Sequence, residues 1–405
     1  DMLSWDQTPA LATMRRCRAW VEIDLGALQH NVQQLTQHLG RQSALMAVVK
    51  ADAYGHGAIA VAQTALSSGA SWLGVATVPE GVELREAGID APILIMGAIN
   101  SAEEVGAIAR WQLQPTLVSP KQALIFSEAL GQRSAPPLPV HLKIDTGMSR
   151  LGFHWSQAPE FVQFVQRLPH LQIASVYSHL ATADNPDPTI LQQQHHRYET
   201  AIAQIAAQGL AHPQHHLANS AATLGYPDLH YDLVRVGLAL YGLYPAPHLQ
   251  PTLALKPVMQ VKARITHLKT IQPGTGVSYG HSFVATQPMQ IAVVGIGYAD
   301  GVPRALSNQM SVLVQGQRVA QIGAITMDQM MIDVTQVPNL QEGSVVTLLG
   351  REGSETLTAD QWATLTSTIS WEILCSFKHR LPRITTPATA ASQASTPATE
   401  PRDRP

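Results

Sequence analysis

A lysine stands where an apolar run meets a turn, in the segment LMAVVKADAYGHG (residues 45–57). Lys50 ends the run, and a glycine-containing turn follows. An unpaired ammonium is costly to bury, whereas partial desolvation lowers the pKa of a lysine from its usual value of about 10.4 and makes it nucleophilic near neutral pH. From its position alone, Lys50 is either a solvated lysine that opens a loop or a nucleophile that forms a Schiff base.

Further motifs that carry acid, base or anion-binding side chains follow along the chain. They are KIDTGMSRLGFH (143–154), SVYSHLATAD (175–184), ANSAATL (218–224), VRVGLALYG (234–242), GVSYG (276–280), GYADG (297–301) and ITMDQ (325–329). In this order, and with the Lys50 segment before them, they closely resemble the alanine racemases, a fold-type III family of pyridoxal-phosphate (PLP) enzymes. The resemblance extends from Ala19 to Ile384, and the ordered set is far more specific than any single motif.

The resemblance implies two bases on opposite faces of the substrate α-carbon. Lys50 matches the lysine that holds PLP as a Schiff base and then acts on one face, and Tyr279 matches the base on the other face. Two are needed because one group that shuttles a proton on a single face returns the original hand. A phenol loses its proton near neutral pH only with help from hydrogen bonds and positive charge. In the family that help comes through a chain that here is Tyr279, His179 and Arg235.

The family arginine that faces the pyridine nitrogen of PLP corresponds to Arg235. A guanidinium is an obligate donor, so the ring nitrogen must accept and stay neutral. The ring is then a weaker electron sink than in enzymes with a carboxylate there, and we expect a short-lived carbanion with few side reactions. The alternative, a surface arginine on a loop, fits poorly beside Gly237 and Gly242.

The phosphate of PLP is expected at the loops after the last two barrel strands, the usual cradle of a parallel barrel. The residues that the resemblance implies there are Tyr54, Asn219, Ser220 and the backbone N–H groups of Gly237 and Leu238. Two simpler interpretations stay open from the residues themselves. Tyr54 suits a structural turn, and ANSA suits a helix N-cap, for which Asn and Ser are preferred.

The substrate side of the site is implied by two other motifs. Arg150 matches the residue that holds the substrate carboxylate and the phenolic oxygen of PLP, and Lys143 matches a lysine that is carbamylated in many members, whose negative charge orients Arg150. Met327 is expected to offer its backbone N–H from the partner subunit, with Asp328 in support. Tyr279 also reaches the barrel of the partner in this family, so a homodimer with shared sites is implied, although GVSYG alone is typical of a hairpin turn.

Two positions depart from the family pattern. His379 stands where members often have a tyrosine that touches the phosphate, and Thr326 stands where a cysteine commonly precedes the Met-Asp pair. By the resemblance both lie near the substrate entrance. The departures therefore bear on substrate breadth more than on the type of reaction.

Short apolar runs alternate with helical patterns through the first 250 residues. The strand candidates are 45–50, 72–77, 93–97, 114–119, 141–145, 173–179, 215–220 and 232–237, and helical segments include 58–70, 79–89, 101–111 and 190–209. Ser101 and Glu104 have the spacing of a capping box. Eight such units predict a (β/α)8 barrel whose site lies at the carboxyl ends of the strands, with an open sheet as the alternative.

A second domain is predicted after the barrel, because the pattern changes to strands without intervening helices. The runs 258–271, 289–299, 310–325 and 343–350 predict a mainly antiparallel β domain, closed by one amphipathic helix over 360–374. We expect an N-terminal arm (1–17), the barrel (18–255), the β domain (256–384) and a disordered tail (385–405) rich in Pro, Ala, Ser and Thr.

Composition limits the classes of function. A formal net charge of -3 leaves no basic field for nucleic acid or anionic lipid, and no run of eighteen apolar residues predicts a membrane span. Two cysteines, Cys17 and Cys375, cannot form a disulfide framework; each is expected to be a buried thiol in a cytoplasmic protein.

The function that these observations predict is PLP-dependent racemisation of L-alanine to D-alanine for peptidoglycan. A racemase of alanine and serine and a decarboxylase on the same scaffold are the alternatives, although a decarboxylase is expected to have an acidic residue where Arg235 stands. A PLP carrier would lack the β domain. A metal-dependent hydrolase finds no support: His195 and His196 lie in a helical segment, and His215 and His216 would face opposite ways on a strand.

Overall fold

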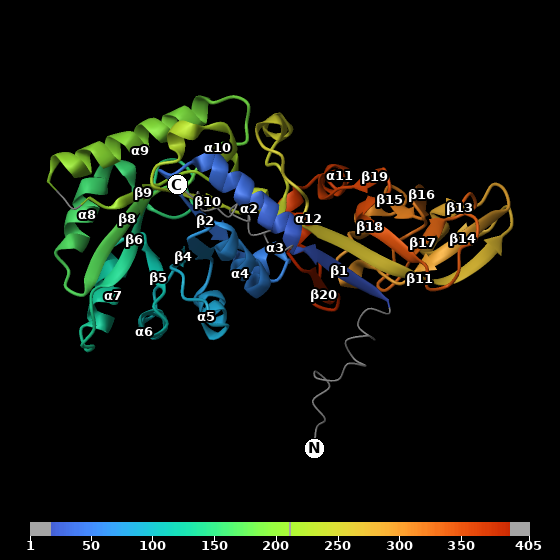
Figure 1. Ribbon diagram of the computed structural model, residues 1–405, viewed down its shortest axis with the longest axis horizontal. Helices are drawn as coiled ribbons and strands as arrows, with labels where there is room; N and C mark the ends of the chain where they lie inside the picture. Colours follow the sequence, from blue (N-terminus) through green and yellow to red (C-terminus); the bar gives the residue numbers. More distant parts are fainter. Residues whose placement is uncertain (1–17, 210–211, 389–405) are drawn as a thin grey trace, which may run out of the picture.

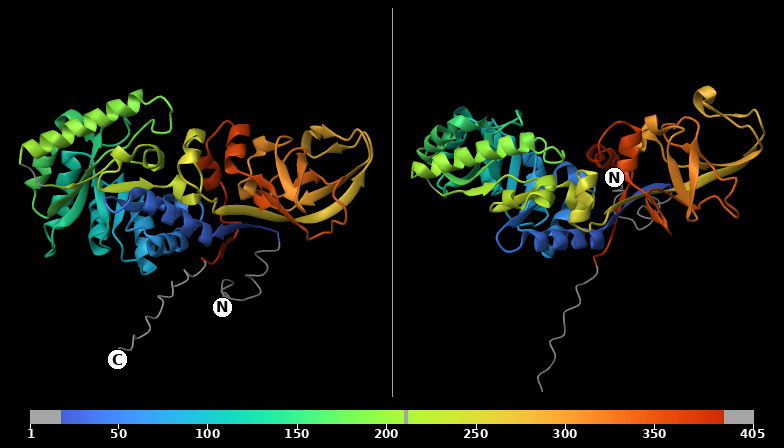
Figure 2. Two further views of the ribbon diagram at one scale, coloured as in Figure 1. Left: turned by 45° about the horizontal axis from the view of Figure 1, so that its top comes forward. Right: turned by 90° about the horizontal axis from the view of Figure 1, so that it is seen from above.

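The computed structural model describes residues 18–209 and 212–388. These residues form two domains that lie side by side along the longest axis of the molecule (Figures 1 and 2). The predicted N-terminal arm, Cys17 and most of the predicted tail lie outside the described residues.

Eight parallel strands form a closed barrel in the first domain. In chain order they are β2 (Ala44–Val48), β3 (Trp72–Val75), β4 (Ile93–Ala98), β5 (Gln114–Leu117), β6 (Leu138–Asp145), β8 (Leu171–Tyr177), β9 (Gln214–His216) and β10 (Leu233–Val236). Each strand pairs with the next, and β10 pairs with β2, so the ring is complete. The predicted barrel is therefore confirmed, and the open-sheet alternative is wrong. Strands β2, β3 and β4 have the near-continuous apolar sequences that are typical of strands buried on both faces.

Helices cover the outside of the barrel. They are α2 (Leu25–Leu39), α4 (Ala58–Ser68), α5 (Val78–Glu86), α6 (Ala102–Arg110), α7 (Pro120–Leu130), α8 (Ala158–Gln166), α9 (Thr189–Ala207) and the short α10 (Ser220–Gly225). Several begin at a residue whose side chain accepts a hydrogen bond from a free N–H of the first turn. Ser101 accepts from the backbone N of Glu104, at the spacing that the sequence predicts.

Shorter elements complete the first domain. They are the turn α3 (Lys50–Tyr54), the strand β7 (Phe153–His154) and the 3-10 turns η2 (Trp155–Gln157), η3 (Pro227–Leu229), η4 (Leu238–Tyr241) and η5 (Pro247–Thr252). Of these, α3 and η4 follow barrel strands β2 and β10 at their carboxyl ends, where the predicted site lies.

The second domain is a mainly antiparallel sheet. Its strands are β1 (Ala19–Asp24), β11 (Met259–Ile271), β14 (Met289–Val294), β15 (Ser311–Val314), β16 (Gln317–Ile322), β17 (Met330–Asp333), β18 (Val345–Glu352), β19 (Glu355–Leu357) and β20 (Arg383–Thr386). A separate hairpin joins β12 (Gly276–Val277) to β13 (Phe283–Val284) through η6 (Tyr279–His281). Two more 3-10 turns, η7 (Tyr298–Asp300) and η8 (Arg304–Leu306), follow β14.

The first strand of the chain belongs to this second sheet. Strand β1 lies between β11, with which it is antiparallel, and β20, with which it is parallel. The sequence predicts a barrel over residues 18–255, so residues 19–24 are a correction to that boundary. Asp24 ends the strand and caps α2 by accepting a hydrogen bond from the backbone N of Ala27, so the chain passes directly from one domain into the other.

Three local predictions in the second half differ from the structure. The run 310–325 is a hairpin, because Gln315 and Gly316 both have positive φ and form a tight turn between β15 and β16. The single helix over 360–374 is wrong; two helices, α11 (Ala359–Leu365) and α12 (Ser370–Cys375), are separated near Ser367, whose φ of 56° breaks the helix. The tail was expected from 385, whereas β20 continues to Thr386.

Candidate functional site

The lysine singled out by the sequence stands at the first residue of an unusual turn. Lys50 follows β2 and begins α3. The next four residues, 51–54, all have φ between 52° and 54°, so this single turn is left-handed. An L-residue in that conformation costs roughly 1–2 kcal/mol, and strain of this kind persists where surrounding contacts hold it. Lys50 stays at the end of β2, and Tyr54 ends the turn with its ring packed on Tyr241.

Glu80 holds this turn in place. Its carboxylate accepts hydrogen bonds from the backbone N of Ala51 (2.6 Å) and from the backbone N of Ala76 and Thr77 (2.9 and 3.0 Å). Asp52 adds a second anchor by accepting from the backbone N of Ala58 (2.8 Å). The loop after β3 and the turn after β2 are therefore tied through one side chain. Glu80 had no signal in the sequence beyond its place as the third residue of a capping box.

Four cationic side chains share this end of the barrel. Burial and the charge of Arg150 lower the pKa of Lys50. Burial, with the charges of Arg235, Arg150 and Lys50, lowers the pKa of Lys143 to about 7. The carboxylates of Glu80 and Asp145 oppose these shifts but do not cancel them. The site is therefore electropositive, and it suits an anion.

Arg235 is fully enclosed in the barrel. Its Nη1 donates to Nδ1 of His216 (2.8 Å), and its Nη2 donates to the carbonyl of Ser178 (2.7 Å) and to Nδ1 of His179 (3.1 Å). The guanidinium also lies 5.0 Å from the ring centre of Tyr177. Among the described residues no partner accepts from its Nε–H, so this donor is left for a ligand. The predicted contact between His179 and Arg235 is present within one chain.

A second group of predicted residues gathers around Gly237. The hydroxyl of Tyr54 lies so close to Gly237 that a β-carbon there would stand 2.1 Å from the phenolic oxygen. The Tyr54 ring packs on Tyr241 with 4.8 Å between ring centres. The hydroxyl of Ser220 accepts from the backbone N of Ala239 (3.2 Å). Tyr54, Ser220 and the loop after β10 are therefore neighbours, as the resemblance implies.

The motif ANSA begins a helix, as its composition allows. Asn219 is the N-cap of α10, and its side chain accepts from the backbone N of Ala222 (3.1 Å). The Asn219 side chain is thus engaged within its own helix. The first N–H groups of α10 and of η4, which begins at Leu238, have no partner within those turns. The two turns meet at Ser220, whose hydroxyl accepts from the backbone N of Ala239.

Two predicted residues lie in the other domain. Tyr279 is 74% exposed and belongs to the loop between β12 and β13, so the hairpin interpretation of GVSYG is also correct. Figure 1 shows β13 at the far end of the second domain, away from β2 and β10. Met327 is 53% exposed. In one chain Tyr279 therefore belongs to a hairpin remote from β2, and no described contact joins Met327 to Lys50.

Asp328 and His379 also have clear surroundings. Asp328 pairs with Nη2 of Arg380 (2.6 Å), and the same arginine donates through Nε to the buried Asp300 (2.8 Å). His379 is exposed and lines a cavity of about 350 Å³ with Val49, Asp52, Ala58, Glu80 and Glu83. This cavity lies beside the left-handed turn. No described contact joins His379 to Tyr54 or Ser220.

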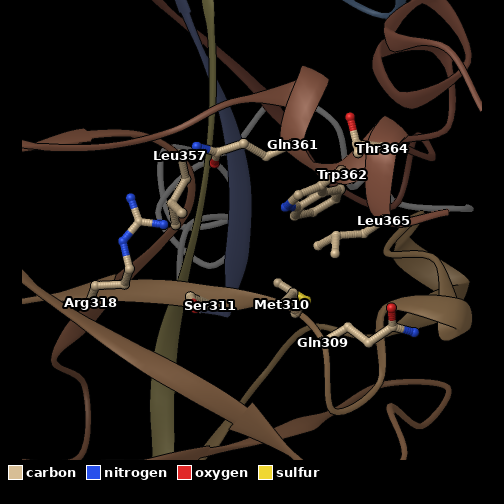
Figure 3. A pocket seen from close by; sticks show the side chains of 9 residues that line it. All are labelled: Gln309, Met310, Ser311, Arg318, Leu357, Gln361, Trp362, Thr364 and Leu365. Atoms are coloured by element: carbon tan, nitrogen blue, oxygen red, sulfur yellow. The ribbon is translucent and has the colours of Figure 1, made fainter. Parts of the chain in front are cut away.

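A further cavity, of about 370 Å³, lies in the second domain and holds none of the predicted residues. Figure 3 shows it between β15 and α11, with the indole of Trp362 at its wall. Its other lining residues are Gln309, Met310, Ser311, Arg318, Leu357, Gln361, Thr364 and Leu365. The site at the barrel mouth therefore stands apart from it.

Tyr177 and His216 are contributors that the sequence analysis did not assign to the site. Their rings stack 4.4 Å apart inside the barrel, and both contact Arg235. Lys143 also lies over Tyr177, 5.6 Å from its ring centre. Tyr177 is two residues before His179, so its place on a strand next to a predicted residue was the one available signal. His215 and His216 do face opposite sides of β9, as predicted, since His216 alone is fully buried.

Several absences hold only for 18–209 and 212–388. Within those ranges no group of three or more His, Cys, Asp or Glu side chains is placed to hold a metal ion. No helix there combines the length and the apolar character that a membrane span requires. Cys375 is an exposed free thiol, so the expectation that it is buried is wrong.

Comparison with known proteins matches one family along nearly the whole chain. The family model described as "Alanine racemase, N-terminal domain" matches residues 23–245, and "Alanine racemase, C-terminal domain" matches residues 258–385. An alanine racemase of Nostoc sp. is 69% identical over 368 residues, 91% of this chain and 95% of its own length. One from Synechocystis sp. is 62% identical over 371 residues, 92% of this chain and 100% of its own length.

Solved structures agree with the fold. An alanine racemase from Clostridium difficile 630 superposes with a TM-score of 0.86 at 33% identity, covering 91% of this chain and 96% of its own. The alanine racemase of Bacillus anthracis with bound L-Ala-P gives a TM-score of 0.85 at 33% identity, covering 92% of this chain and 95% of its own. The similarity therefore includes both domains.

Proposed function

This chain belongs to the alanine racemase family, and from that premise we propose that it interconverts L- and D-alanine with PLP by a two-base mechanism. We also propose that the enzyme is a homodimer in the cytoplasm and that its D-alanine is used for peptidoglycan. The observation that carries the proposal is the cluster of Lys50, Lys143, Arg150 and Arg235 at the barrel mouth, where the pKa values of both lysines are lowered although the carboxylates of Glu80 and Asp145 oppose the shifts.

The residues at the barrel mouth fit PLP. A phosphate and a substrate carboxylate are anions, and an electropositive, partly buried site stabilises both. Gly237 leaves the space that the Tyr54 hydroxyl fills, and the hydroxyl of Ser220 lies beside the same loop. We propose that the phosphate is held by Tyr54, Ser220 and the backbone N–H groups of Gly237 and Leu238, with Asn219 keeping α10 in place. His379 stays a predicted contributor.

PLP, when bound, supplies an electron sink for the negative charge that develops at the substrate α-carbon. Lys50 supplies two functions. Its amine attaches the cofactor covalently, and its lowered pKa leaves more free amine near neutral pH than an exposed lysine has. Once displaced by substrate, the same amine accepts or returns a proton on one face of the α-carbon.

Tyr279 is proposed as the base on the opposite face. Its 74% exposure in this chain leaves the hydroxyl free to enter another subunit. His179, which accepts from Arg235, is then the neighbour that eases its deprotonation. Met327 is proposed to enter the partner's site with it and to donate its backbone N–H to the substrate carboxylate.

Arg235 is proposed to donate its remaining Nε–H to the pyridine nitrogen. Because a guanidinium keeps its protons, the ring nitrogen stays unprotonated and less charge is withdrawn from the α-carbon. This favours return of the proton over side reactions and argues against the decarboxylase alternative. Arg150 is proposed to bind the substrate carboxylate, and Lys143, whose pKa is about 7, has the free amine that carbamylation requires.

The proposal is tested by measuring optical rotation of L-alanine with the PLP-loaded enzyme, together with carbon dioxide release. Loss of rotation without carbon dioxide is expected. The second candidate is a racemase of both alanine and serine, which the departures at Thr326 and His379 keep open. Measuring the loss of optical rotation across a panel of L-amino acids distinguishes it from an enzyme that acts on alanine alone. Carbon dioxide release, or no loss of rotation for any substrate, would refute the proposal.

Sharing of sites between subunits is tested by complementation. Lys50→Ala and Tyr279→Ala chains are each expected to be inactive, because each lacks one base in every site. Mixed dimers contain one site with both bases and one with neither, so activity should return on co-expression. If both bases act within one chain, every site in the mixture lacks one base and no activity returns.

A further inference from the structure

A belt of hydrogen bonds crosses the inside of the barrel behind Arg235. From Nη1 of Arg235 it passes to Nδ1 of His216 (2.8 Å), and from Nε2 of His216 to the hydroxyl of Ser175 (2.9 Å). Ser175 contacts Nδ1 of His141 (2.5 Å), and Nε2 of His141 contacts Oε1 of Gln114 (2.7 Å). The five residues come from β10, β9, β8, β6 and β5, which are neighbours in that order around the barrel.

The belt has one direction, because it starts at a group that only donates. A guanidinium offers no acceptor, so Nδ1 of His216 must accept and its proton must stand on Nε2. That proton points to Ser175, whose own hydroxyl proton is then free to point to Nδ1 of His141. His141 therefore also carries its proton on Nε2, facing the carbonyl oxygen of Gln114. Every proton in this arrangement meets an acceptor.

The opposite arrangement of the last two links leaves a proton without a partner. If the Gln114 amide turns and donates to Nε2 of His141, then Nδ1 of His141 must donate to Ser175. Ser175 would accept from both histidines, and its hydroxyl proton would have no acceptor. Ser175 and both histidines have no exposed surface, so water does not replace the missing bond. The arrangement that runs outward from Arg235 is therefore favoured.

Within the described part of the chain, no carboxylate is a hydrogen-bond partner of Arg235, although Arg235 is buried. Its partners on this side are neutral, since burial and the charge of Arg235 hold the pKa of His216 well below its usual value and burial lowers that of His141 to about 3. A chain of aligned dipoles takes the place of a counter-ion. It also limits rotation of the guanidinium, because Nη1 is directed to one ring nitrogen.

We propose that Gln114, His141 and Ser175 are positioning residues that act on Arg235 through His216, fixing both imidazoles with their protons on Nε2 and keeping the Nε–H of Arg235 directed into the ligand site. The importance of that Nε–H rests on the proposed function, in which it meets the pyridine nitrogen. The proton arrangement itself does not depend on the reaction.

Neutron diffraction from a deuterated crystal of the holoenzyme tests the arrangement directly. Deuterium is expected on Nε2 of His216 and His141 and on the Ser175 oxygen, pointing to His141. Deuterium on Nδ1 of either histidine would overturn the inference. This measurement uses the unaltered chain, so it does not depend on whether a variant folds.

Kinetics of Ser175→Ala test the effect on Arg235. Loss of one buried hydrogen bond in the belt is expected to lower kcat for alanine roughly 3- to 10-fold, with KM changed less than about twofold, because Arg235 does not bind the substrate carboxylate. The matched control is Ser127→Ala, which removes a buried hydroxyl that bonds the carbonyl of Pro169 (2.8 Å) outside the barrel. Its kcat is expected within about twofold of the parent.

Each result separates the two proposals. If Ser175→Ala behaves like Ser127→Ala in an active enzyme, the belt does not position Arg235, and the inference fails while the proposed function stands. If the parent enzyme does not racemise any amino acid, the proposed function fails. The neutron result then decides alone whether the belt has the inferred direction.

Discussion

The hydroxyl of Tyr54 rests against the α-carbon of Gly237, in the space that any other residue at position 237 would fill with its β-carbon. This contact joins the left-handed turn after β2 to the loop after β10. The φ of Gly237 is -107°, so a left-handed φ is not what requires glycine here, and the space that a β-carbon needs is taken by Tyr54.

Gly237→Ala is therefore expected to displace Tyr54 and to weaken PLP binding roughly tenfold, the scale of a moderately overpacked site. Absorbance titration of the apoenzyme with PLP measures the change. Gly131→Ala is the control, because its added β-carbon would lie 3.4 Å from its nearest neighbour, an ordinary contact. Equal affinity in the two variants would mean that Tyr54 does not hold the phosphate from this position.

Lys143→Met is expected to make stability less dependent on pH. The pKa of Lys143 is about 7 when folded and about 10.4 when unfolded, so between these values the unfolded chain binds more protons and stability of the parent rises with pH. Below about pH 7 Lys143 is charged in both states, so its destabilising contribution is at its largest.

Thermal unfolding of the apoenzymes in buffer free of carbon dioxide measures this difference. Lys143→Met should melt roughly a few degrees above the parent at pH 6, and the gap should narrow as pH rises from 7 to 10. Lys269→Met, at an exposed position, should show a small gap that does not vary in this way. A gap for Lys143→Met that is constant with pH would contradict the assigned pKa.

Ala51→Gly is expected to stabilise the fold. Ala51 is exposed and has a φ of 52°, so glycine relieves a steric cost of roughly 1–2 kcal/mol against a smaller entropic loss, for a net gain of roughly 0.5 kcal/mol. Ala203→Gly, exposed within α9, is expected to destabilise by about 1 kcal/mol. Urea unfolding compares the two. If both glycine variants changed the free energy of unfolding in the same direction, left-handed strain at Ala51 would be ruled out.

Tyr279→Phe is expected to slow racemisation roughly 100- to 10,000-fold while leaving the fold intact, because the phenol supplies one of two proton transfers. In D2O the variant should then exchange the α-hydrogens of the two alanine enantiomers at different rates. The enantiomer whose α-hydrogen faces Lys50 keeps its exchange with solvent, and the other loses most of it. NMR follows both. Tyr226→Phe, on the barrel, serves as the control, and equal loss for both enantiomers would contradict a base on each face.

The barrel was predictable because its strands and helices follow from local pattern. Eight strand-like runs that alternate with helical segments predict parallel strands, and Lys50 follows the first of them. The division into barrel and β domain followed from the change of pattern near residue 250. These features depend on residues close in sequence, which is where periodicity carries information.

Features that depend on distant contacts were not predictable. Ala51 and Ala53 give no sign of a left-handed turn, which glycine usually provides; the turn exists because Glu80 and Asp52 anchor it. Ser175 and Gln114 have no spacing that relates them to Arg235, since strand order around the barrel brings them together. The place of β1 in the second sheet likewise required its pairing with β11.

The pairing of β1 with β11 also determines when each domain can be completed. A ribosome makes residues 19–24 before the whole barrel and residues 259–271 after it. During synthesis β1 therefore waits as an unpaired edge, already joined to the barrel through the Asp24 cap of α2. The later sheet must assemble around a strand that the earlier domain holds, so the β domain made alone would lack one of its internal strands.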